Sequence, residues 1–462
     1  MMIINEQEIL KTLDKTSSPS SEKIHTILAK AKKLQRLSIE ETSNLINTTK
    51  PELVKEILDA ALFVKEEIYG NRIVFFAPLY ISNHCLNNCQ YCAFRTDNKD
   101  IARKALSKEE IEIETLELIK QGHKRVLLVA GEAYPQGQGL DYILNAIDTI
   151  YSVNYKNNNI RRINVNIAPL ETEEFKILKA KNIGTYQVFQ ETYHRATYKE
   201  VHPHGPKSDY DYRLTAIDRA FEAGIDDVGV GVLYGLADWK FETLAMLQHI
   251  EHLETKHGLG PHTISVPRIE PAAGSPLTEN PPAPVSDDDF KKIVAILRLA
   301  VPYTGLILST RENPKIRREI LNLGISQISA GSKTNPGGYS KSKKKMGEQF
   351  SLGDHRPLDE VIFDLLKNGY LPSFCTACYR LGRTGLDFME YAKPGDIRKK
   401  CAPNAIVTFK EFLCDFASPK TKELGEQKIA ELLNEHNENP KTKEFIKKSL
   451  KSIEDGKRDL FI

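Results

Sequence analysis

Through the middle of the chain, short apolar runs rich in β-branched residues alternate with longer segments whose apolar residues recur at helical spacing. Such short runs predict buried strands, and the longer segments predict helices. The eight predicted strands are 73–81, 125–130, 163–167, 186–189, 228–233, 263–266, 306–308 and 325–328. The helical segments between them include 108–120, 171–180, 212–223, 241–256 and 287–299. Regular alternation of this kind predicts an α/β protein whose parallel strands close into a (β/α)8, or TIM, barrel.

Helical patterns flank this alternating region on both sides. Before it, residues 38–41 (Ser-Ile-Glu-Glu) predict a helix cap and first turn, and residues 51–70 carry apolar side chains at helical spacing. After Ser329 the alternation stops, and a segment rich in Gly, Ser and Lys at 331–353 leads to a helix at 358–367. We therefore expect an amino-terminal helical extension at 1–70, the barrel at 71–335, and a mostly helical carboxy-terminal domain at 336–462 that caps the barrel.

Composition and charge exclude several classes of protein. Hydrophobic residues make up 40% and charged residues 27% of the 462 residues, as in ordinary globular proteins. The formal net charge of +2 gives no electrostatic reason to bind nucleic acid or a membrane surface. The amino-terminal segment lacks the apolar core of a secretion signal, and no run approaches the roughly 18 apolar residues of a membrane span. We expect a cytoplasmic protein without nucleic-acid or membrane partners.

The most informative feature is a group of three cysteines, Cys85-x3-Cys89-x2-Cys92, directly after the first predicted strand. A cubane [4Fe–4S] cluster bound by three thiolates keeps one iron without a protein ligand, and that iron can bind a chelating cofactor and transfer an electron to it. The alternatives are a zinc loop and a group of buried thiols. Zinc sites usually combine two cysteines with a distant second pair. The spacing favours the cluster, and it resembles the signature of radical S-adenosylmethionine (SAM) enzymes.

A second group, Cys375-x2-Cys378-x22-Cys401, supplies three more thiolates. This spacing fits a structural zinc site completed by Cys414 or a histidine, and it also fits an auxiliary cluster with an open iron. Cys414 lies on the apolar face of a predicted helix, which favours a buried, inert thiol. With the first cluster in the same chain, we favour iron–sulfur for the second site. Tight cysteine groups also indicate a reducing compartment, because disulfides are rare there.

The two cysteine groups together resemble the HydG family, the tyrosine lyases that mature FeFe-hydrogenase. The similarity includes the segments 189–194 (Phe-Gln-Glu-Thr-Tyr-His) and 261–268 (Pro-His-Thr-Ile-Ser-Val-Pro-Arg) and the tail, and it runs over almost the whole chain. It implies a barrel of the radical SAM type. The related tyrosine lyase of thiamine synthesis, 2-iminoacetate synthase (ThiH), shares the barrel but lacks the second cysteine group.

The resemblance implies a set of SAM contacts. Tyr91 lies before the third cysteine, where the family places backbone near the adenine. Gly131 and Glu132 match a Gly-Gly-Glu turn that holds the amino group of SAM, with Ala130 in place of the first glycine. Glu191 and Arg213 match positions that bind the ribose and the carboxylate. The alternatives are an ordinary strand-to-helix turn at 130–132 and a surface ion pair for Glu191 or Arg213.

Three residues are candidates to bind the substrate tyrosine. Arg311 follows the seventh predicted strand, at the barrel face where active sites lie, and a guanidinium there can bind a carboxylate in bidentate fashion. Ser329 ends the eighth strand, and Tyr80 precedes the first cysteine group. By the resemblance, all three look like amino-acid ligands. Alternatively, Arg311 pairs with Glu312 or Glu319, and Tyr80 packs in the wall.

His262 precedes the sixth predicted strand and therefore lies at the amino-terminal face of the barrel, opposite the first cysteine group. The resemblance places an auxiliary [4Fe–4S] cluster at that face, with a histidine bound to an additional labile iron. Imidazole is a suitable iron ligand. His262 is thus a candidate metal ligand together with Cys375, Cys378 and Cys401, and the alternative is a capping histidine after Pro261.

The resemblance implies a carbon–carbon lyase of the radical SAM type with two clusters. SAM cleavage would start Cα–Cβ scission of L-tyrosine to p-cresol and dehydroglycine. The small fragment would then give carbon monoxide and cyanide at the auxiliary cluster, building an Fe(CO)2(CN) unit for hydrogenase maturation. Maturation scaffold proteins and an electron donor are the implied partners. Two alternatives stay open, a 2-iminoacetate synthase of thiamine (thiazole) synthesis and a non-catalytic iron–sulfur scaffold.

Overall fold

The computed structural model describes residues 3–135, 137–340, 347–435 and 440–462. Eight parallel strands close into a barrel, because β10 pairs with β1 as well as with β9. Their bounds in chain order are β1 Arg72–Ser82, β2 Arg125–Ala130, β5 Arg162–Asn166, β6 Tyr186–Gln187, β7 Val228–Gly231, β8 Thr263–Ser265, β9 Gly305–Leu308 and β10 Gln327–Ser329. The predicted (β/α)8 barrel is confirmed, and each predicted strand overlaps an observed one.

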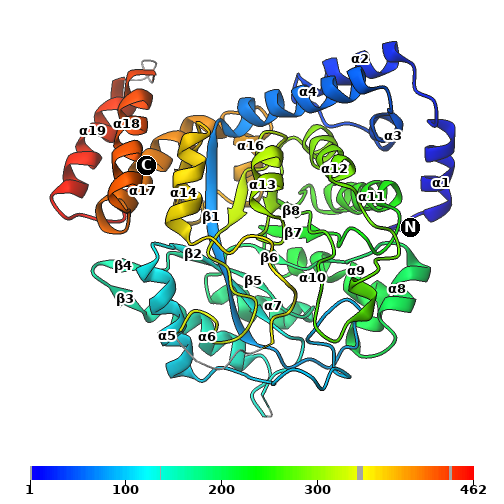
Figure 1. Ribbon diagram of the computed structural model, residues 1–462, viewed down its shortest axis with the longest axis horizontal. Helices are drawn as coiled ribbons and strands as arrows, with labels where there is room; N and C mark the ends of the chain where they lie inside the picture. The colour runs from blue at the N-terminus through cyan, green and yellow to red at the C-terminus, as the bar shows by residue number, and fades with distance from the viewer. Residues whose placement is uncertain (1–2, 136, 341–346, 436–439) are drawn as a thin grey trace.

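Helices surround the barrel in the order expected for α/β units (Figure 1). Their bounds are α5 Lys108–Lys120, α6 Asp141–Ser152, α7 Thr172–Ala180, α8 Arg195–Val201, α9 Tyr210–Leu214, α10 Ala216–Glu222, α11 Trp239–His257, α12 Asp287–Ala300 and α13 Pro314–Leu321. Short elements in the loops are the hairpin β3 Asn154–Tyr155 and β4 Asn158–Asn159, and the 3-10 turns Pro206–Ser208 and Pro276–Thr278. The segment predicted as one helix over 212–223 is divided into α9 and α10. At the break, the Arg219 guanidinium donates to the Tyr212 carbonyl, replacing a helical backbone bond.

The first 70 residues form four helices, as predicted: α1 Glu6–Lys15, α2 Ser21–Ala31, α3 Ile39–Asn47 and α4 Pro51–Tyr69. Ser38 caps α3 through a reciprocal capping box with Glu41, which satisfies backbone donors at the start of the helix. These helices contact α11 and α12 of the barrel and bury apolar side chains against them. No helix in the described part of the chain has the length and apolar character needed to span a membrane.

The carboxy-terminal region is attached to the barrel by a strand that the sequence did not predict. This strand, β11 Leu371–Ser373, pairs in parallel with the first residues of β1. It is followed by α15 Ala377–Arg380, α16 Gly385–Ala392, α17 Ile397–Asp415, α18 Pro419–Glu435 and α19 Pro440–Glu454, and preceded by α14 Leu358–Lys367. Helices α17 to α19 lie beside the barrel in Figure 1. The domain boundaries near residues 70 and 335 stay predictions.

Aromatic stacking and one buried ion pair join this region to the barrel. Phe374, directly after β11, stacks between Phe75 of β1 and Phe412 of α17, with ring centroids 5.6 and 5.2 Å apart. Such pairs stabilise by more than the area they bury. Arg161, before β5, pairs with Glu411 of α17 at 2.7 Å, with 3% and 0% of the two side chains exposed.

We expect Glu411→Ala to lower the free energy of unfolding by about 3 kcal/mol, because it removes the buried carboxylate that pairs with Arg161 and leaves this buried cation only the partly exposed Asp459. Chemical denaturation followed by circular dichroism measures this loss. The matched control is Asp396→Ala, which removes the partner of the exposed Lys399. It should change the stability by about 1 kcal/mol or less. Equal effects of the two substitutions would show that burial does not set the strength of the Arg161–Glu411 contact.

Candidate metal centres

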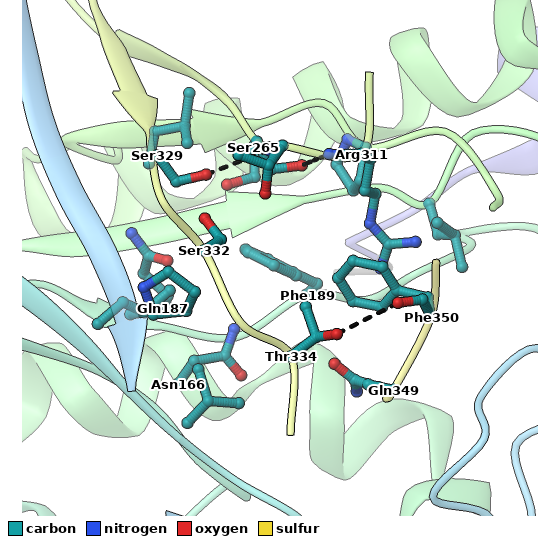
Figure 2. A pocket seen from close by; sticks show the side chains of 18 of the residues that line it. Asn166, Gln187, Phe189, Ser265, Arg311, Ser329, Ser332, Thr334, Gln349 and Phe350 are labelled. Atoms are coloured by element: carbon teal, nitrogen blue, oxygen red, sulfur yellow. Dashed lines mark hydrogen bonds between the residues drawn. The ribbon is translucent and has the colours of Figure 1, made fainter. Parts of the chain in front are cut away.

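A cavity of about 160 Å³ opens at the carboxyl ends of the barrel strands, where active sites of this fold lie. Its wall comes from the strand ends and from the loop 347–354 (Figure 2). Among the residues predicted from sequence, six line this cavity: Tyr80, Tyr91, Cys92, Glu191, Arg311 and Ser329. The barrel thus brings together side chains that are up to about 250 positions apart in the chain.

The first cysteine group lies in the loop that follows β1. Cys89 is buried, and Cys85 and Cys92 are partly exposed. Residues 201–205 cover this loop, because the carbonyls of Val201 and His204 accept hydrogen bonds from the loop backbone. Cys89 and Tyr91 also pack against Val201 and Leu233. The loop is therefore fixed by its neighbours on one side and faces the cavity through Cys92.

The donor set of this loop fits an iron–sulfur cluster. Burial raises the pKa of the Cys85, Cys89 and Cys92 thiols, that of Cys92 to about 11, so metal binding must release their protons. Within the described residues, no three His, Cys, Asp or Glu side chains converge closely enough to hold a single metal ion. In a cubane each thiolate binds a different iron, so its ligands surround the cluster and do not meet at one point. Three thiolates supplied by one loop suit a cluster that keeps one iron open.

Two buried ion pairs lie beside the loop. Arg213 donates to Glu132 at 2.9 Å, and Lys207 donates to Glu191 at 2.8 Å. Although burial acts to raise it, the charges of Arg213 and Lys207 hold the pKa of Glu132 below its usual range. The Asn87 amide also donates to Glu132, at 2.7 Å, and ties the network to the cysteine loop.

These ion pairs test the alternative that Glu191 or Arg213 forms a surface ion pair. Glu191 and Arg213 do form ion pairs, but these pairs are buried and lie at the mouth of the strands rather than on the surface. Sequence reasoning missed Lys207, because residues 202–207 carry no periodicity or motif. The one local signal is Gly205, whose φ of +97° and close approach to Asn87 exclude a side chain.

The turn after β2 requires a glycine at position 131. A Cβ atom there would lie 2.1 Å from the His84 carbonyl oxygen, directly before Cys85. The Gly131 amide donates to the Ser82 carbonyl at 2.9 Å, which holds the turn against the end of β1. The next residue, Glu132, thereby presents its backbone N–H to the Cys85 sulfur. Gly131 and Glu132 are outside the cavity wall, but they support the cysteine loop.

The Arg311 guanidinium lies over the Phe350 ring, with its central carbon 3.3 Å from the ring centroid (Figure 2). The alternative partners are already engaged, because Glu312 pairs with Arg268 and Glu319 pairs with Lys291. In the described part of the chain, no carboxylate forms an ion pair with Arg311.

The two other predicted substrate ligands already make hydrogen bonds. The Tyr80 hydroxyl donates to the Gln349 side-chain oxygen at 2.7 Å. The Ser329 hydroxyl oxygen accepts a bond from the Thr310 amide at 3.1 Å and keeps its own hydrogen for another acceptor.

A second cavity, of about 50 Å³, opens at the opposite end of the barrel. Its wall includes Cys375, Cys378, Cys401 and His262 together with the first residues of β1, β2 and β10. Cys375 follows β11 and Cys378 lies in α15, so the pairing of β11 with β1 carries both thiols under the barrel. The fold thus brings His262 to the same cavity as the second cysteine group.

His262 faces an unusual carboxylate. Asp227 Oδ2 lies 3.6 Å from His262 Nδ1, and in the described residues neither oxygen of Asp227 has a hydrogen-bond partner. Burial lowers the pKa of His262, so the imidazole is neutral, the form that binds metals. Phe388 packs against the imidazole with ring centroids 4.3 Å apart.

The expectation that Cys414 is buried is wrong, since this thiol near the end of α17 is half-buried and lies outside both cavities.

Comparison with known proteins gives matches over the whole chain. Residues 79–249 match the family model of the radical SAM superfamily, and residues 265–371 match the Biotin and Thiamin Synthesis associated domain. The 2-iminoacetate synthase of Salmonella typhimurium is 33% identical over 73% of this chain and 86% of its own length. The Escherichia coli 2-iminoacetate synthase is 32% identical over the same shares.

Two solved structures are similar over almost their full length. A crystal structure of HydG, a maturase of the [FeFe]-hydrogenase, is 53% identical with a TM-score of 0.96 and covers 100% of both chains. The HydG structure from Carboxydothermus hydrogenoformans is 42% identical with a TM-score of 0.84 and covers 96% of this chain and 97% of that one.

We expect Gly131→Ala to displace the cysteine loop, because the added methyl group overlaps the His84 carbonyl. The overlap should cost about 1–3 kcal/mol of stability and reduce the iron retained after anaerobic reconstitution. Thermal denaturation and iron analysis measure the two effects. The control is Ala130→Gly, the reciprocal exchange at the neighbouring position, which should retain the iron. Full iron content in Gly131→Ala would contradict the required close approach.

Proposed function

Because the chain belongs to the HydG family of [FeFe]-hydrogenase maturases, within the radical SAM superfamily, we propose that it cleaves the Cα–Cβ bond of L-tyrosine to p-cresol and dehydroglycine. The radical SAM domain implies one [4Fe–4S] cluster and SAM. One observation carries the proposal beyond this: two cavities lie at opposite ends of one barrel, with Cys92 of the first cysteine group in the wall of one and all three thiols of the second group in the wall of the other.

We propose that Cys85, Cys89 and Cys92 hold the radical SAM cluster. When bound, the reduced cluster and SAM supply a 5′-deoxyadenosyl radical that abstracts a hydrogen atom. The chain contributes a fixed loop, an apolar wall at Leu233, and the hydrogen-bond donors of the surrounding backbone. Apolar side chains around the loop would limit the access of water and so protect a reactive species from side reactions.

The proposed SAM contacts are Tyr91, Gly131, Glu132, Glu191 and Arg213. Their position beside the cysteine loop supports this assignment, and the two buried ion pairs hold the charged groups in place before a ligand arrives. A carboxylate has about four acceptor positions, so Glu132 and Glu191 can each accept a further hydrogen bond. The Tyr91 ring is fixed by its hydroxyl, which bonds to His202 at 2.7 Å.

We propose that Arg311 binds the carboxylate of tyrosine, with Tyr80 and Ser329 as further ligands. Stacking on Phe350 supports this role, because the five N–H donors of a guanidinium lie in its plane and stay available at its edge. A carboxylate bound there would orient the amino group of the substrate toward the cysteine loop. Phe189 and Phe350 supply apolar surface for the substrate ring in the same cavity.

At the other end, we propose that Cys375, Cys378 and Cys401 hold an auxiliary [4Fe–4S] cluster and that His262 binds an additional labile iron. Such a centre supplies open iron for carbon monoxide and cyanide made from the small tyrosine fragment, and an Fe(CO)2(CN) unit would leave for hydrogenase maturation. Asp227 would hold the His262 Nδ1 hydrogen, which leaves Nε2 to the iron. A scaffold protein and an electron donor are the proposed partners.

The alternatives account for fewer features. A 2-iminoacetate synthase would release dehydroglycine and would not need three thiols and a histidine in a second cavity. A non-catalytic cluster scaffold would not need Arg311 with an available donor edge in a cavity at the carboxyl ends of the strands.

We expect replacement of Cys375 and Cys378 by Ala to leave SAM cleavage and p-cresol formation within about twofold of the unaltered enzyme, because these thiols lie at the far end of the barrel from Cys92. Carbon monoxide and protein-bound cyanide should fall below detection. Anaerobic turnover with SAM, tyrosine and a reductant tests this division of the reaction between the two ends of the barrel. The p-cresol formed is measured by chromatography. Loss of p-cresol formation in protein whose first cluster is intact would refute it.

His262→Ala should lower the iron content of the auxiliary centre while its cluster is retained. Asp227→Asn should weaken binding of the labile iron by about 10–100-fold, since it removes the charge that orients the imidazole. Iron analysis and the electron paramagnetic resonance (EPR) spectrum of the auxiliary centre measure both effects. The control is His25→Ala, an exposed histidine of α2. Unchanged iron content and spectrum in His262→Ala would refute the ligand assignment.

A further inference from the structure

The loop 347–354 connects the substrate cavity with the cysteine loop. Its backbone is fixed at several points: the Gln349 amide donates to the Thr334 carbonyl at 3.0 Å, and the Gln349 carbonyl accepts from the Ala93 amide at 3.2 Å. Further along, the Gly353 amide donates to the Thr310 carbonyl at 3.0 Å. Gln349 is therefore held between the end of the barrel and the residue that follows Cys92.

The Gln349 side chain bridges two predicted functional residues. Its Nε2 lies 3.5 Å from the Cys92 sulfur, and its oxygen accepts the Tyr80 hydroxyl at 2.7 Å. The opposite amide orientation would place an oxygen against the sulfur, and a metal-bound thiolate has no hydrogen to offer. Donation from Gln349 to Cys92 is thus the orientation that suits a metal-bound thiolate.

Gln349 differs from the other neighbours of the cysteine loop because its side chain donates a hydrogen bond to a cysteine sulfur. In the part of the chain that the structure describes, no other side chain donates a hydrogen bond to Cys85, Cys89 or Cys92. The remaining donors to these sulfurs are backbone amides, which no side-chain substitution removes. Gln349 is therefore the side chain whose substitution would remove a hydrogen bond from the Cys92 sulfur.

We propose that Gln349 is a positioning residue that raises the reduction potential of the radical SAM cluster through its hydrogen bond to Cys92, and that Tyr80 strengthens this bond. The proposal rests on the assignment of that cluster to Cys85, Cys89 and Cys92. Reduction adds negative charge to the cluster, and a hydrogen bond to a thiolate stabilises the more negative state. Donation from the Tyr80 hydroxyl polarises the amide and makes its N–H a stronger donor.

The test is the midpoint potential of the cluster, measured by anaerobic redox titration with EPR detection, without SAM or tyrosine. Gln349→Met and Gln349→Leu both fill the space without a donor, and both should lower the potential. A tenfold loss in the equilibrium constant for one-electron reduction is a shift of about 59 mV. We expect a shift of this order for both variants, and a smaller shift in the same direction for Tyr80→Phe.

Thr334→Val is the matched control, because the Thr334 hydroxyl bonds to the Phe350 carbonyl of the same loop but touches no cysteine. Its potential should equal that of the unaltered protein. Unchanged potentials in Gln349→Met and Gln349→Leu would overturn the proposal. An equal shift in Thr334→Val would overturn it too, and so would loss of the cluster from both Gln349 variants. Either result would show that Gln349 stabilises the position of the loop and does not act on the reduced cluster through its hydrogen bond to Cys92. The titration contains no tyrosine, so it is independent of the proposed lyase activity.

Discussion

The backbone pairing of β1 determines where both candidate centres lie. This strand of 11 residues is roughly 35 Å long and pairs with β2 and β10 within the barrel. Its carboxyl end leads directly into the loop with Cys85, and its first residues pair with β11, which leads directly to Cys375. One strand therefore separates the two cysteine groups by the height of the barrel. Any change that shifted its register would move both groups.

The two ends of the barrel stabilise charge in different ways. At the carboxyl end, Glu132 and Glu191 each pair with a buried cation, so these two carboxylates are neutralised without a ligand. At the amino end, both carboxylate oxygens of Asp227 lack hydrogen-bond partners within the described residues. A buried carboxylate without partners is costly, which favours occupation of that end by a group that brings positive charge to His262.

Local patterns predicted the fold well, and long-range contacts account for what they missed. Strands and helices of the barrel followed from apolar periodicity, and the cysteine groups followed from spacing within short segments. β11 escaped prediction because it has three residues with a proline in the middle, and only pairing with β1 makes it a strand. Lys207, Gln349 and Asp227 escaped because no sequence pattern links them to their partners, which lie 16 positions away for Lys207 and 257 for Gln349. Nothing in a single sequence relates such positions.

The interior between the two cavities differs from an ordinary barrel core, which branched apolar side chains fill. Here Gln187 lines the first cavity and donates to Thr263 at 3.4 Å. At the other end, Gln327 lines the second cavity and accepts from Arg125 at 3.5 Å.

Glycines provide the room for these polar side chains. A Cβ atom at Gly229 would lie 2.5 Å from the Thr263 hydroxyl, and one at Gly305 would lie 2.8 Å from the Gln327 amide. Hydrogen bonds as long as those of Gln187 and Gln327 are weak, so these groups can exchange partners at low cost. Polar side chains at these positions therefore offer weak hydrogen bonds to a small polar group, which an apolar barrel core would not.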